Sequence, residues 1–423
     1  MKRGATGLVL LMATVVTVAV AGQHPCAAQT YTVTDLGTLR TNNGGTSAAR
    51  AISAGGVIVG FATNNSGVLH AFSRSESGVM TDLGSFNSAA FGSRANAIND
   101  ADQVAGTSLT QPGGFASAFR GMAGGDLGQN LPELDGGGDS AGMAINAGGL
   151  VVGWSNRQIG CGGAFCISNP GQAVRWNGLN VIEVPMLGSV GGLATGINND
   201  GFICGSSSLG TSPGPHAFRV PPGGSSADDL GTLGGTRSEA AAINNAAVVV
   251  GNADLASGVP HAARWLAGST TAEDLGTLAS RPSSTATAVS PTGLIVGFAS
   301  NENTTLPRAV LFQSGTAPLD LNSMIHADSG WTLQAAYGVN DAGQVVGEGQ
   351  LNGMARAFLL TPVPVCGADY NDDGVVNPDD LSDFINGYFA NPPEPGADFN
   401  GDQTTNPDDL SDFINEFFGP NCV

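Results

Sequence analysis

The chain has 423 residues with a formal net charge of -20, 64 glycines, 22 prolines and 6% aromatic residues. Abundant glycine with few aromatic residues favours many short strands and tight turns over packed helices. The few basic side chains are dispersed, which excludes nucleic acid as an expected partner, because neutralising a phosphate backbone requires clustered Lys and Arg.

Residues 1–28 have the pattern of a secretory signal peptide. Lys2 and Arg3 precede an apolar stretch over residues 7–22, and small residues lead to a cleavage site after Ala28. No later segment has the roughly 18 consecutive apolar residues of a membrane helix. We therefore expect a protein that is secreted or held at the cell surface, with no membrane span, in a compartment that permits disulfides.

Residues 29–361 contain one ten-residue segment seven times. Each copy combines an Ala-Ile-Asn strand and its turn with an apolar strand of the Val-Val-Gly type, and the copies begin at residues 51, 97, 144, 196, 242, 288 and 338. Two more segments complete each period, one with an invariant alanine, as in His70-Ala71-Phe72, and one of the Asp-Leu-Gly type. Because this period suits a four-stranded blade, we predict an all-β, seven-bladed β-propeller.

The order of these segments predicts how the ring closes. The first Asp-Leu-Gly segment, at Asp35, has no His-Ala-Phe strand before it, and the last strand of that kind, at Ala357, has no Asp-Leu-Gly strand after it. Residues 31–37 can therefore pair beside residues 356–360 and close the seventh blade, which removes exposed sheet edges. The invariant alanines should face crowded contacts between adjacent sheets.

The asparagines of the repeated turns have an expected structural role. Asn tolerates the left-handed region and hydrogen-bonds its own backbone, so the turn is predicted to place Asn in that conformation. The asparagines concerned are Asn99, Asn146, Asn198, Asn244 and Asn340.

The repeats resemble the extracellular HAF family, which is named after triplets such as His70-Ala71-Phe72 and His216-Ala217-Phe218. The resemblance covers nearly all of residues 31–361. It implies a secreted, β-rich repeat domain and brings no known activity and no assigned catalytic residues.

Candidates for catalysis in the ring are residues that break the repeat. The histidines at positions 70, 216 and 261 share one repeating position, which favours packing over ligation. Acids outside the repeat are Glu133, Asp135, Asp139, Asp328 and Glu348. Glycosidase chemistry needs two carboxyl groups about 5 to 9.5 Å apart, and solvated loop positions are the expected alternative for each acid.

An insertion over residues 154–171 is the best candidate for a binding surface of the ring. It contains Cys161 and Cys166, which could form a disulfide that closes a small loop. Cys204 replaces an apolar residue of a repeated strand and is expected to stay a free, buried thiol.

Residues 366–423, after a Pro-containing linker over residues 362–365, hold 13 of the 35 acidic side chains and no Lys or Arg. Oxygen-bearing residues occupy the ligand positions of two twelve-residue calcium loops, and a helix that begins at proline follows each loop. The expected Ca²⁺ ligands are Asp369, Asn371, Asp373, Val375 through its carbonyl, Asn377 and Asp380 in the first loop, and Asp398, Asn400, Asp402, Thr404, Asn406 and Asp409 in the second.

One position distinguishes the two loops. Gln403 occupies position 6 of the second loop, where the first has Gly374. A side chain in the left-handed conformation costs about 1 kcal/mol, so the second site is expected to bind calcium more weakly. Each following helix should bury one apolar face, formed in the first by Leu381, Phe384, Ile385 and Tyr388.

A duplicated loop and helix resembles the dockerin family, in particular its Cys-bracketed form, over residues 366–423. The resemblance implies calcium-dependent folding and a cohesin-like or other cell-surface receptor protein as partner. It implies two equivalent binding faces, with contacts at Asp379, Ser382, Asp408 and Ser411. Cys366 and Cys422 bracket the module, and a disulfide there would tie its ends together.

Three functions fit this sequence. We favour a secreted, non-catalytic binding or structural module that the C-terminal domain attaches to an extracellular assembly. The second is a glycoside hydrolase, a lyase or a polysaccharide-binding component of a cellulosome-like complex, and the third is a ligand sensor with structural calcium. A channel lined by two facing acids and exposed aromatics would favour the second, and a narrow channel of Ala, Val and Gly the first.

Overall fold

The computed structural model describes residues 31–75, 78–110, 115–136, 138–161, 164–167, 171–188, 191–210, 214–301, 306–313, 315–363, 368, 370–371, 377–390, 393–400 and 404–418. The chain forms two compact units, Thr30–Val363 and a unit that contains both C-terminal helices. Within the described ranges, no helix is both long and apolar enough to cross a bilayer.

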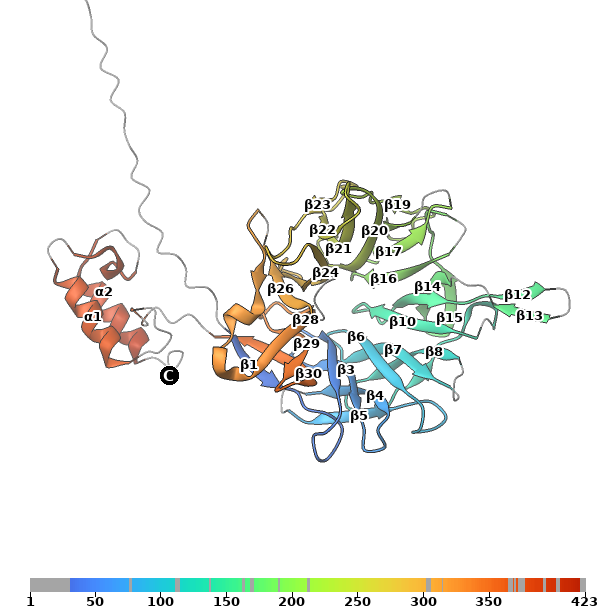
Figure 1. Cartoon of the computed structure of the whole chain (residues 1–423), viewed down its shortest axis with the longest axis horizontal. Coiled ribbons are helices and arrows are strands. Elements are labelled where there is room, and N and C mark those ends of the chain that lie inside the picture. The colour runs from blue at the N-terminus through green and yellow to red at the C-terminus, as the bar shows by residue number, and fades with distance from the viewer. Residues whose placement is uncertain are drawn as a thin grey trace, which may run out of the picture. The chain divides into compact units, whose positions relative to one another are not determined.

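Seven four-stranded antiparallel sheets make up the first unit in the described part of the chain, and they stand as blades around a common centre (Figure 1). Blade 1 holds β2 (Ser47–Ile52), β3 (Ile58–Thr63), β4 (Leu69–Arg74) and β5 (Met80–Gly84). Blade 2 holds β6 (Ser93–Ile98), β7 (Gln103–Leu109), β8 (Ala116–Met122) and β9 (Gln129–Asn130). The predicted seven-bladed β-propeller is confirmed.

Blade 3 holds β10 (Ser140–Ile145), β11 (Val151–Ser155), β14 (Gln172–Asn177) and β15 (Asn180–Glu183). Blade 4 holds β16 (Gly192–Ile197), β17 (Ile203–Ser208), β18 (Pro215–Val220) and β19 (Asp228–Asp229). Blade 5 holds β20 (Gly234–Ile243), β21 (Val249–Leu255), β22 (Pro260–Trp265) and β23 (Glu273–Asp274).

Blade 6 holds β24 (Ser283–Val289), β25 (Ile295–Ser300), β26 (Arg308–Phe312) and β27 (Leu319–Asp320). Blade 7 holds β28 (Trp331–Val339), β29 (Val345–Leu351), β30 (Met354–Pro362) and β1 (Tyr31–Asp35). Outside the blades, β12 (Gln158–Cys161) pairs with β13 (Ala164–Ile167) in the blade 3 insertion. Three short 3-10 helices lie in the blade connections, Leu134–Gly136, Leu321–Met324 and Ala327–Ser329.

The ring closes as predicted, through the N-terminal strand. Strand β1 pairs antiparallel with β30 from Tyr31 opposite Pro362 to Asp35 opposite Phe358. Arg356, which is 2% exposed, reinforces the junction, since its Nε lies 3.8 Å from the Asp35 carboxylate and its terminal nitrogens donate to the carbonyls of Asn43 and Gly45. Residues more than 300 positions apart in the sequence are thus joined by main chain and side chain together.

The repeated asparagines bond their own turn, as expected, and also bond the next blade. Asn99 Oδ1 accepts from the Gln103 N–H at 2.9 Å, and its Nδ2 donates to the Asn146 carbonyl at 2.8 Å. The same inter-blade bond runs from Asn146 to Asn198, from Asn198 to Asn244, from Asn244 to Ser290 and from Asn340 to Ser53. The bond from Asn340 crosses the closure, so the same contact joins the last blade to the first.

The prediction that these asparagines adopt the left-handed conformation is wrong. The positive φ falls three residues later, at Asp102 (φ 59°) in blade 2 and at Ala247 (φ 57°) in blade 5, with glycine at the equivalent place in the other blades. The Asn side chain spans that turn by accepting the N–H four residues on, and none of the five asparagines has a positive φ.

The invariant alanines are fully buried between adjacent blades, as expected. Ala71 packs against Val104 and Phe119 of the next blade, and its N–H donates to Ser93 Oγ at 2.8 Å. Ser93 Oγ in turn donates to the Gly84 carbonyl of the first blade. A larger side chain in place of Ala71 would overpack this contact and separate the two blades.

Each innermost strand carries a β-bulge at the same place. In blade 5, Ala240 lies opposite Gly251 and Ala242 opposite Val250, so that Ala241 has no partner in the ladder. The equivalent unpaired residues of the other blades are Arg50, Asn96, Met143, Thr195, Thr287 and Tyr337. A bulge of this kind turns one side chain out of the alternating pattern of its strand.

The bulge explains the repeated glycine, which lies within the second strand of each blade and does not end it. A Cβ on Gly251 would collide with the Glu239 carbonyl, and the glycines of the other six blades meet a carbonyl in the same way. The innermost strand therefore approaches its neighbour so closely that a hydrogen must stand where other residues carry a side chain.

The C-terminal unit contains two equivalent helices, α1 (Pro378–Tyr388) and α2 (Pro407–Phe417), and a short 3-10 helix, Pro395–Ala397. Phe384 and Phe413 are fully buried, and their rings stack with centroids 4.0 Å apart and an interplanar angle of 4°. The expected apolar faces form, except at one equivalent position in each helix. Ile385 is 37% exposed and Ile414 is 38% exposed, because both lie beside the buried stripe and not within it.

We expect Gly251→Ala to lower the free energy of unfolding by about 1–3 kcal/mol, because the new methyl group forces the bulge and its neighbour apart. Denaturant unfolding of the protein measures this loss. Gly55→Ala is the matched control, since the nearest atom to its new Cβ, Ser53 Oγ, is 3.9 Å away. Equal stability of the two variants would contradict the close-approach argument.

Candidate functional site

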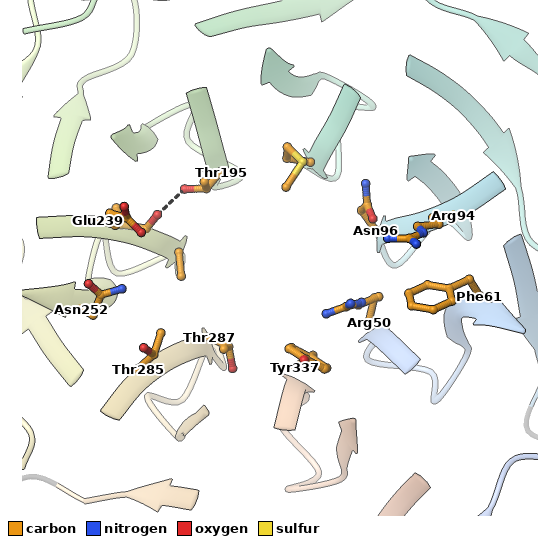
Figure 2. A pocket seen from close by; sticks show the side chains of 13 residues that line it. Arg50, Phe61, Arg94, Asn96, Thr195, Glu239, Asn252, Thr285, Thr287 and Tyr337 are labelled. Carbon is orange, nitrogen blue, oxygen red and sulfur yellow. Dashed lines mark hydrogen bonds between the residues drawn. The ribbon is translucent and has the colours of Figure 1, made fainter. Parts of the chain in front are cut away.

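The bulged residues line a cavity of about 480 Å³ in the centre of the ring, which we call the channel cavity (Figure 2). Polar members of its lining include Arg50, Arg94, Asn96, Glu239, Asn252 and Tyr337, together with three threonines at 195, 285 and 287. Each of these polar side chains lies on the innermost strand of its blade, except Asn252, which lies on a second strand. Phe61, an aromatic member of the lining, also lies on a second strand. The cavity is within the range of volumes typical of small-molecule sites.

Two arginines on neighbouring blades share one aromatic ring in this cavity. The guanidinium carbon of Arg50 lies 5.2 Å from the Phe61 ring centroid, and that of Arg94 lies 4.7 Å from the same centroid. Arg50 also lies 4.1 Å from the centroid of Tyr337. Cation–π contacts of this kind hold the guanidinium groups in place without neutralising them.

Tyr337 connects the arginine side of the cavity to the second strand of blade 7. Its hydroxyl donates to Glu348 Oε1 at 2.7 Å. Burial raises the pKa of Tyr337 to about 12, and the Glu348 charge acts in the same direction, whereas the nearby Arg50 charge opposes the shift. The phenol is therefore a neutral donor at physiological pH, and it uses that donor on Glu348.

The pair of facing acids that glycosidase chemistry requires is not found in the described lining of the channel cavity. The carboxylate there is Glu239, whose Oε1 lies 3.6 Å from an Arg237 nitrogen. The wall is also unlike a narrow channel of small apolar residues. The described channel lining therefore matches neither expectation: it has no pair of facing acids, as an enzyme of glycosidase type would, and it is not a narrow channel of Ala, Val and Gly, as a purely structural ring would have.

The acids that break the repeat have partners or loop positions of their own. Glu133 accepts from Ser117 Oγ at 2.9 Å, Asp135 lies 3.1 Å from Arg157 Nε, and Asp139 accepts from the Ala116 N–H at 2.8 Å. Glu348 is the partner of Tyr337, and Asp328 belongs to the 3-10 helix Ala327–Ser329. Glu133, Asp135, Asp139 and Asp328 therefore lie in connections between strands, as expected, whereas the expectation of a solvated loop position is wrong for Glu348, which lies within β29.

A second cavity of about 530 Å³ lies where the insertion joins blade 3. Its lining includes Trp154, Asn156 and Gly171 from the two ends of the insertion, together with Asp139 and Glu239. Glu239 thus borders both cavities. The insertion contributes to a concave surface of the ring, where sequence analysis placed its candidate binding loop.

The insertion hairpin places Cys161 opposite Ala164 and Cys166 opposite Ile159. The disulfide between the two cysteines stays a prediction. Cys204 is a free thiol with 0% exposure, as expected, and burial raises its pKa to about 12. A thiol held neutral in this way is a poor nucleophile and acts as a small apolar side chain.

The repeating histidines pair with the repeating aspartates of their own blades. His70 Nδ1 lies 2.9 Å from Asp82, and the pairs of His216 with Asp229 and of His261 with Asp274 are both at 3.0 Å. The same aspartates accept an N–H from the glycine two residues on, as in Gly84 to Asp82 at 2.7 Å. This geometry fixes the outer strand to the third strand, which agrees with the expected packing role.

Sequence reasoning missed Arg50, Arg94, Glu239 and Tyr337. A signal was available for Arg50 and Tyr337, because the residue before each repeated Ala-Ile-Asn segment varies among the blades: Arg50, Asn96, Met143, Thr195, Ala241, Thr287 and Tyr337. Variation at one phase of an otherwise regular repeat marks a position that the fold does not constrain.

In the C-terminal unit, the described ligand candidates cluster at the start of each helix. Asp380 is fully buried and accepts from the Asn377 N–H at 2.8 Å and the Asn371 N–H at 3.2 Å. Asp409, also fully buried, repeats this with Asn406 at 2.8 Å and Asn400 at 3.1 Å. Asn377 and Asn406 cap their helices in matching capping boxes.

Other expected residues of this unit lie outside the described residues, namely Asp369, Asp373, Val375, Asp402, Cys366 and Cys422. Asp398 and Thr404 are described. In the described part of the chain, no three His, Cys, Asp or Glu side chains are grouped closely enough to hold a metal ion. The expected partner contacts Asp379, Ser382, Asp408 and Ser411 are all exposed.

Comparisons with known proteins identify no family for this chain. No family model matches the chain, and no curated protein matches it. A puromycin hydrolase S511A mutant complexed with PGG has a similar structure, with a TM-score of 0.47 and 15% identity over 74% of this chain and 53% of that chain. This chain thus spans about half the length of that hydrolase.

Two further solved structures show the same kind of similarity. TolB from Acinetobacter baumannii has a TM-score of 0.35 and 13% identity over 74% of this chain and 64% of that one. Trypanosoma rangeli sialidase in complex with sialic acid has a TM-score of 0.37 and 10% identity over 79% of this chain and 59% of that one. These similarities are too distant to transfer an activity. The chain is a seven-bladed β-propeller protein with a small helical C-terminal unit.

The raised pKa of Tyr337 predicts a loss of stability in alkali. Its pKa of about 12 in the folded protein exceeds the ordinary value of 10.0, so the stabilisation is complete below pH 10 and is lost as pH rises towards 12. Ultraviolet titration should show a late tyrosinate signal whose amplitude falls in Tyr337→Phe; Tyr31 and Tyr370, whose pKa values are also raised by burial, contribute to both proteins. Glu348→Gln should move the Tyr337 component to lower pH, because it deletes a charge that disfavours the phenolate. A late signal of unchanged amplitude in Tyr337→Phe would contradict the assignment.

Proposed function

We propose that this protein is an exported, non-catalytic binding or structural propeller, and that its C-terminal unit is a dockerin-type module that attaches it to an extracellular or cell-surface assembly in a calcium-dependent manner. The observation that carries the proposal is the pair of buried carboxylates, Asp380 and Asp409, at equivalent places in the two copies.

A buried carboxylate requires compensation for the water it has lost. Backbone N–H groups supply part of it to Asp380 and Asp409, but residues 366–423 contain no Lys or Arg that could supply a positive charge. A divalent cation would supply that charge, and oxygen donors alternate along both loops in the order that calcium sites use. The residues present therefore fit calcium, with Asp369, Asn371, Asp373, Val375, Asn377 and Asp380 as the proposed first set.

The second set, Asp398, Asn400, Asp402, Thr404, Asn406 and Asp409, is proposed to bind more weakly because of Gln403. Bound calcium supplies positive charge that allows the carboxylates of each loop to lie close together. The core of this unit is small, consisting of Ala368, Phe384 and Phe413 with partly buried neighbours. Calcium binding should therefore contribute much of its folding free energy.

The near-identity of the two copies supports two equivalent partner faces. Asp379 and Ser382 on α1 correspond to Asp408 and Ser411 on α2, and all four side chains are exposed. Each face is continued by a phenylalanine that is 72% exposed, Phe389 after α1 and Phe418 after α2. Such large exposed apolar side chains beside polar ones are typical of protein-binding surfaces, and a cohesin-like receptor is the proposed partner.

We expect calorimetry on the mature protein to detect calcium binding that disappears when Asp369→Ala and Asp398→Ala are combined, because each substitution removes the first ligand of one loop. Far-ultraviolet circular dichroism should show a loss of helix in chelator. The matched control combines Asp379→Ala with Asp408→Ala, which removes two exposed acids that are not ligands. Full calcium binding by the ligand variant would refute the assignment.

The duplicated faces make a second prediction. Surface proteins captured by the mature protein in calcium should be released by chelator, because the faces depend on the folded helices. Asp379→Ala with Ser382→Ala should leave capture intact, since the second face remains, and so should Asp408→Ala with Ser411→Ala. Combining all four substitutions should abolish it. Capture by the fourfold variant at the wild-type level, with its calcium binding retained, would exclude these faces.

A further inference from the structure

The channel cavity has a positively charged wall. Arg50 and Arg94 lie on neighbouring blades and face the same ring, Phe61. Among the described residues, no carboxylate oxygen lies within 4.0 Å of either guanidinium group, although five pairs of an arginine with a carboxylate occur elsewhere in the described chain. Two like charges held close together favour an anion between or beside them.

The arginines are arranged so that their donors remain usable. The rings of Tyr337 and Phe61 lie against the guanidinium groups through cation–π contacts, which consume no carboxylate. The N–H donors lie in the guanidinium plane, where they match the two oxygens of a carboxylate. A carboxylate is therefore the chemical group that this wall fits best.

The opposite side of the cavity offers acceptors. Figure 2 shows Thr195, Glu239, Asn252 and Thr285 across the cavity from the arginines. Thr195 Oγ1 donates to the Ala240 carbonyl at 2.8 Å, and Thr287 Oγ1 donates to the Ala336 carbonyl, so both hydroxyls keep their lone pairs for a ligand. The Glu239 carboxylate is an acceptor as well. Groups that donate hydrogen bonds, such as hydroxyls, would satisfy this side.

We propose that the channel cavity binds a small hydroxylated organic carboxylate, with Arg50 and Arg94 receiving its carboxylate and the Thr195, Glu239 and Asn252 side receiving its hydroxyls. A single hexuronic acid has this chemistry, and the volume of about 480 Å³ accommodates it. The site lies wholly within the propeller. It does not depend on the calcium module, and it supplies the ring with a ligand of its own.

The experiment is isothermal titration of the mature protein with sodium D-glucuronate at constant, low ionic strength, with D-glucose and sodium sulfate as separate titrants. We expect glucuronate to bind, glucose to bind at least tenfold more weakly, and sulfate to bind more weakly than glucuronate. Because the wall acts through charge, raising the salt concentration should weaken glucuronate binding. Chelator should leave it unchanged, which separates this result from the calcium proposal.

Variants identify the residues. Arg50→Gln and Arg94→Gln should each weaken glucuronate binding tenfold or more, whereas Arg74→Gln, at an arginine that does not line the cavity, should not. Arg94 is exposed, so its replacement tests the site even where Arg50→Gln lowers stability, and circular dichroism with thermal melting verifies the fold of each variant. No glucuronate binding, or equal binding by Arg94→Gln, would overturn the proposal. Sulfate that binds as tightly as glucuronate would overturn the assigned role of the hydroxyl-binding side.

Discussion

The close approach of the two innermost strands in every blade is the constraint on which the rest of the ring depends. A bulge brings one carbonyl of the first strand against the second strand, and glycine is required at the point of contact, as at Gly251 beneath the Glu239 carbonyl. The bulge increases local twist and releases one residue from the ladder. It therefore shapes the blade and at the same time directs a side chain towards the centre.

Recurring contacts then join the blades. At five junctions a serine at the start of an innermost strand bonds the invariant alanine of the preceding blade, and at five a turn asparagine bonds the turn of the next blade. Across the closure, Ser47 bonds Ala357, Asn340 bonds Ser53, and β1 completes the sheet of blade 7. Since the last junction uses the same groups as most of the others, the number of blades is set by the number of repeats and the ring needs no special cap.

This regularity explains what could be predicted from the sequence. The spacing of the glycine-ended segments predicted the blades, and the phase of the Asp-Leu-Gly segments predicted the closure by residues 31–37, because both follow from main-chain pairing. The bulge does not alter the pattern of apolar and polar residues along the innermost strands. That pattern therefore could not predict that Arg50 and Tyr337 point into the channel. The exposure of Ile385 was missed for a related reason, since helical spacing places it at the edge of a stripe that two phenylalanines already fill.

The bulged position combines a fixed backbone with a free side chain. Its main chain is held by a glycine contact and by hydrogen bonds on both sides, while the side chain points into the channel and packs into no blade core, so Met143, Thr195 and Tyr337 are all accommodated at equivalent places. Seven such positions surround one cavity, and substitutions there change its chemistry without changing the sheets. The chemistry of the cavity, with two arginines at one side and acceptors at the other, is therefore set by the side chains and not by the sheets. The same scaffold would equally hold an apolar channel.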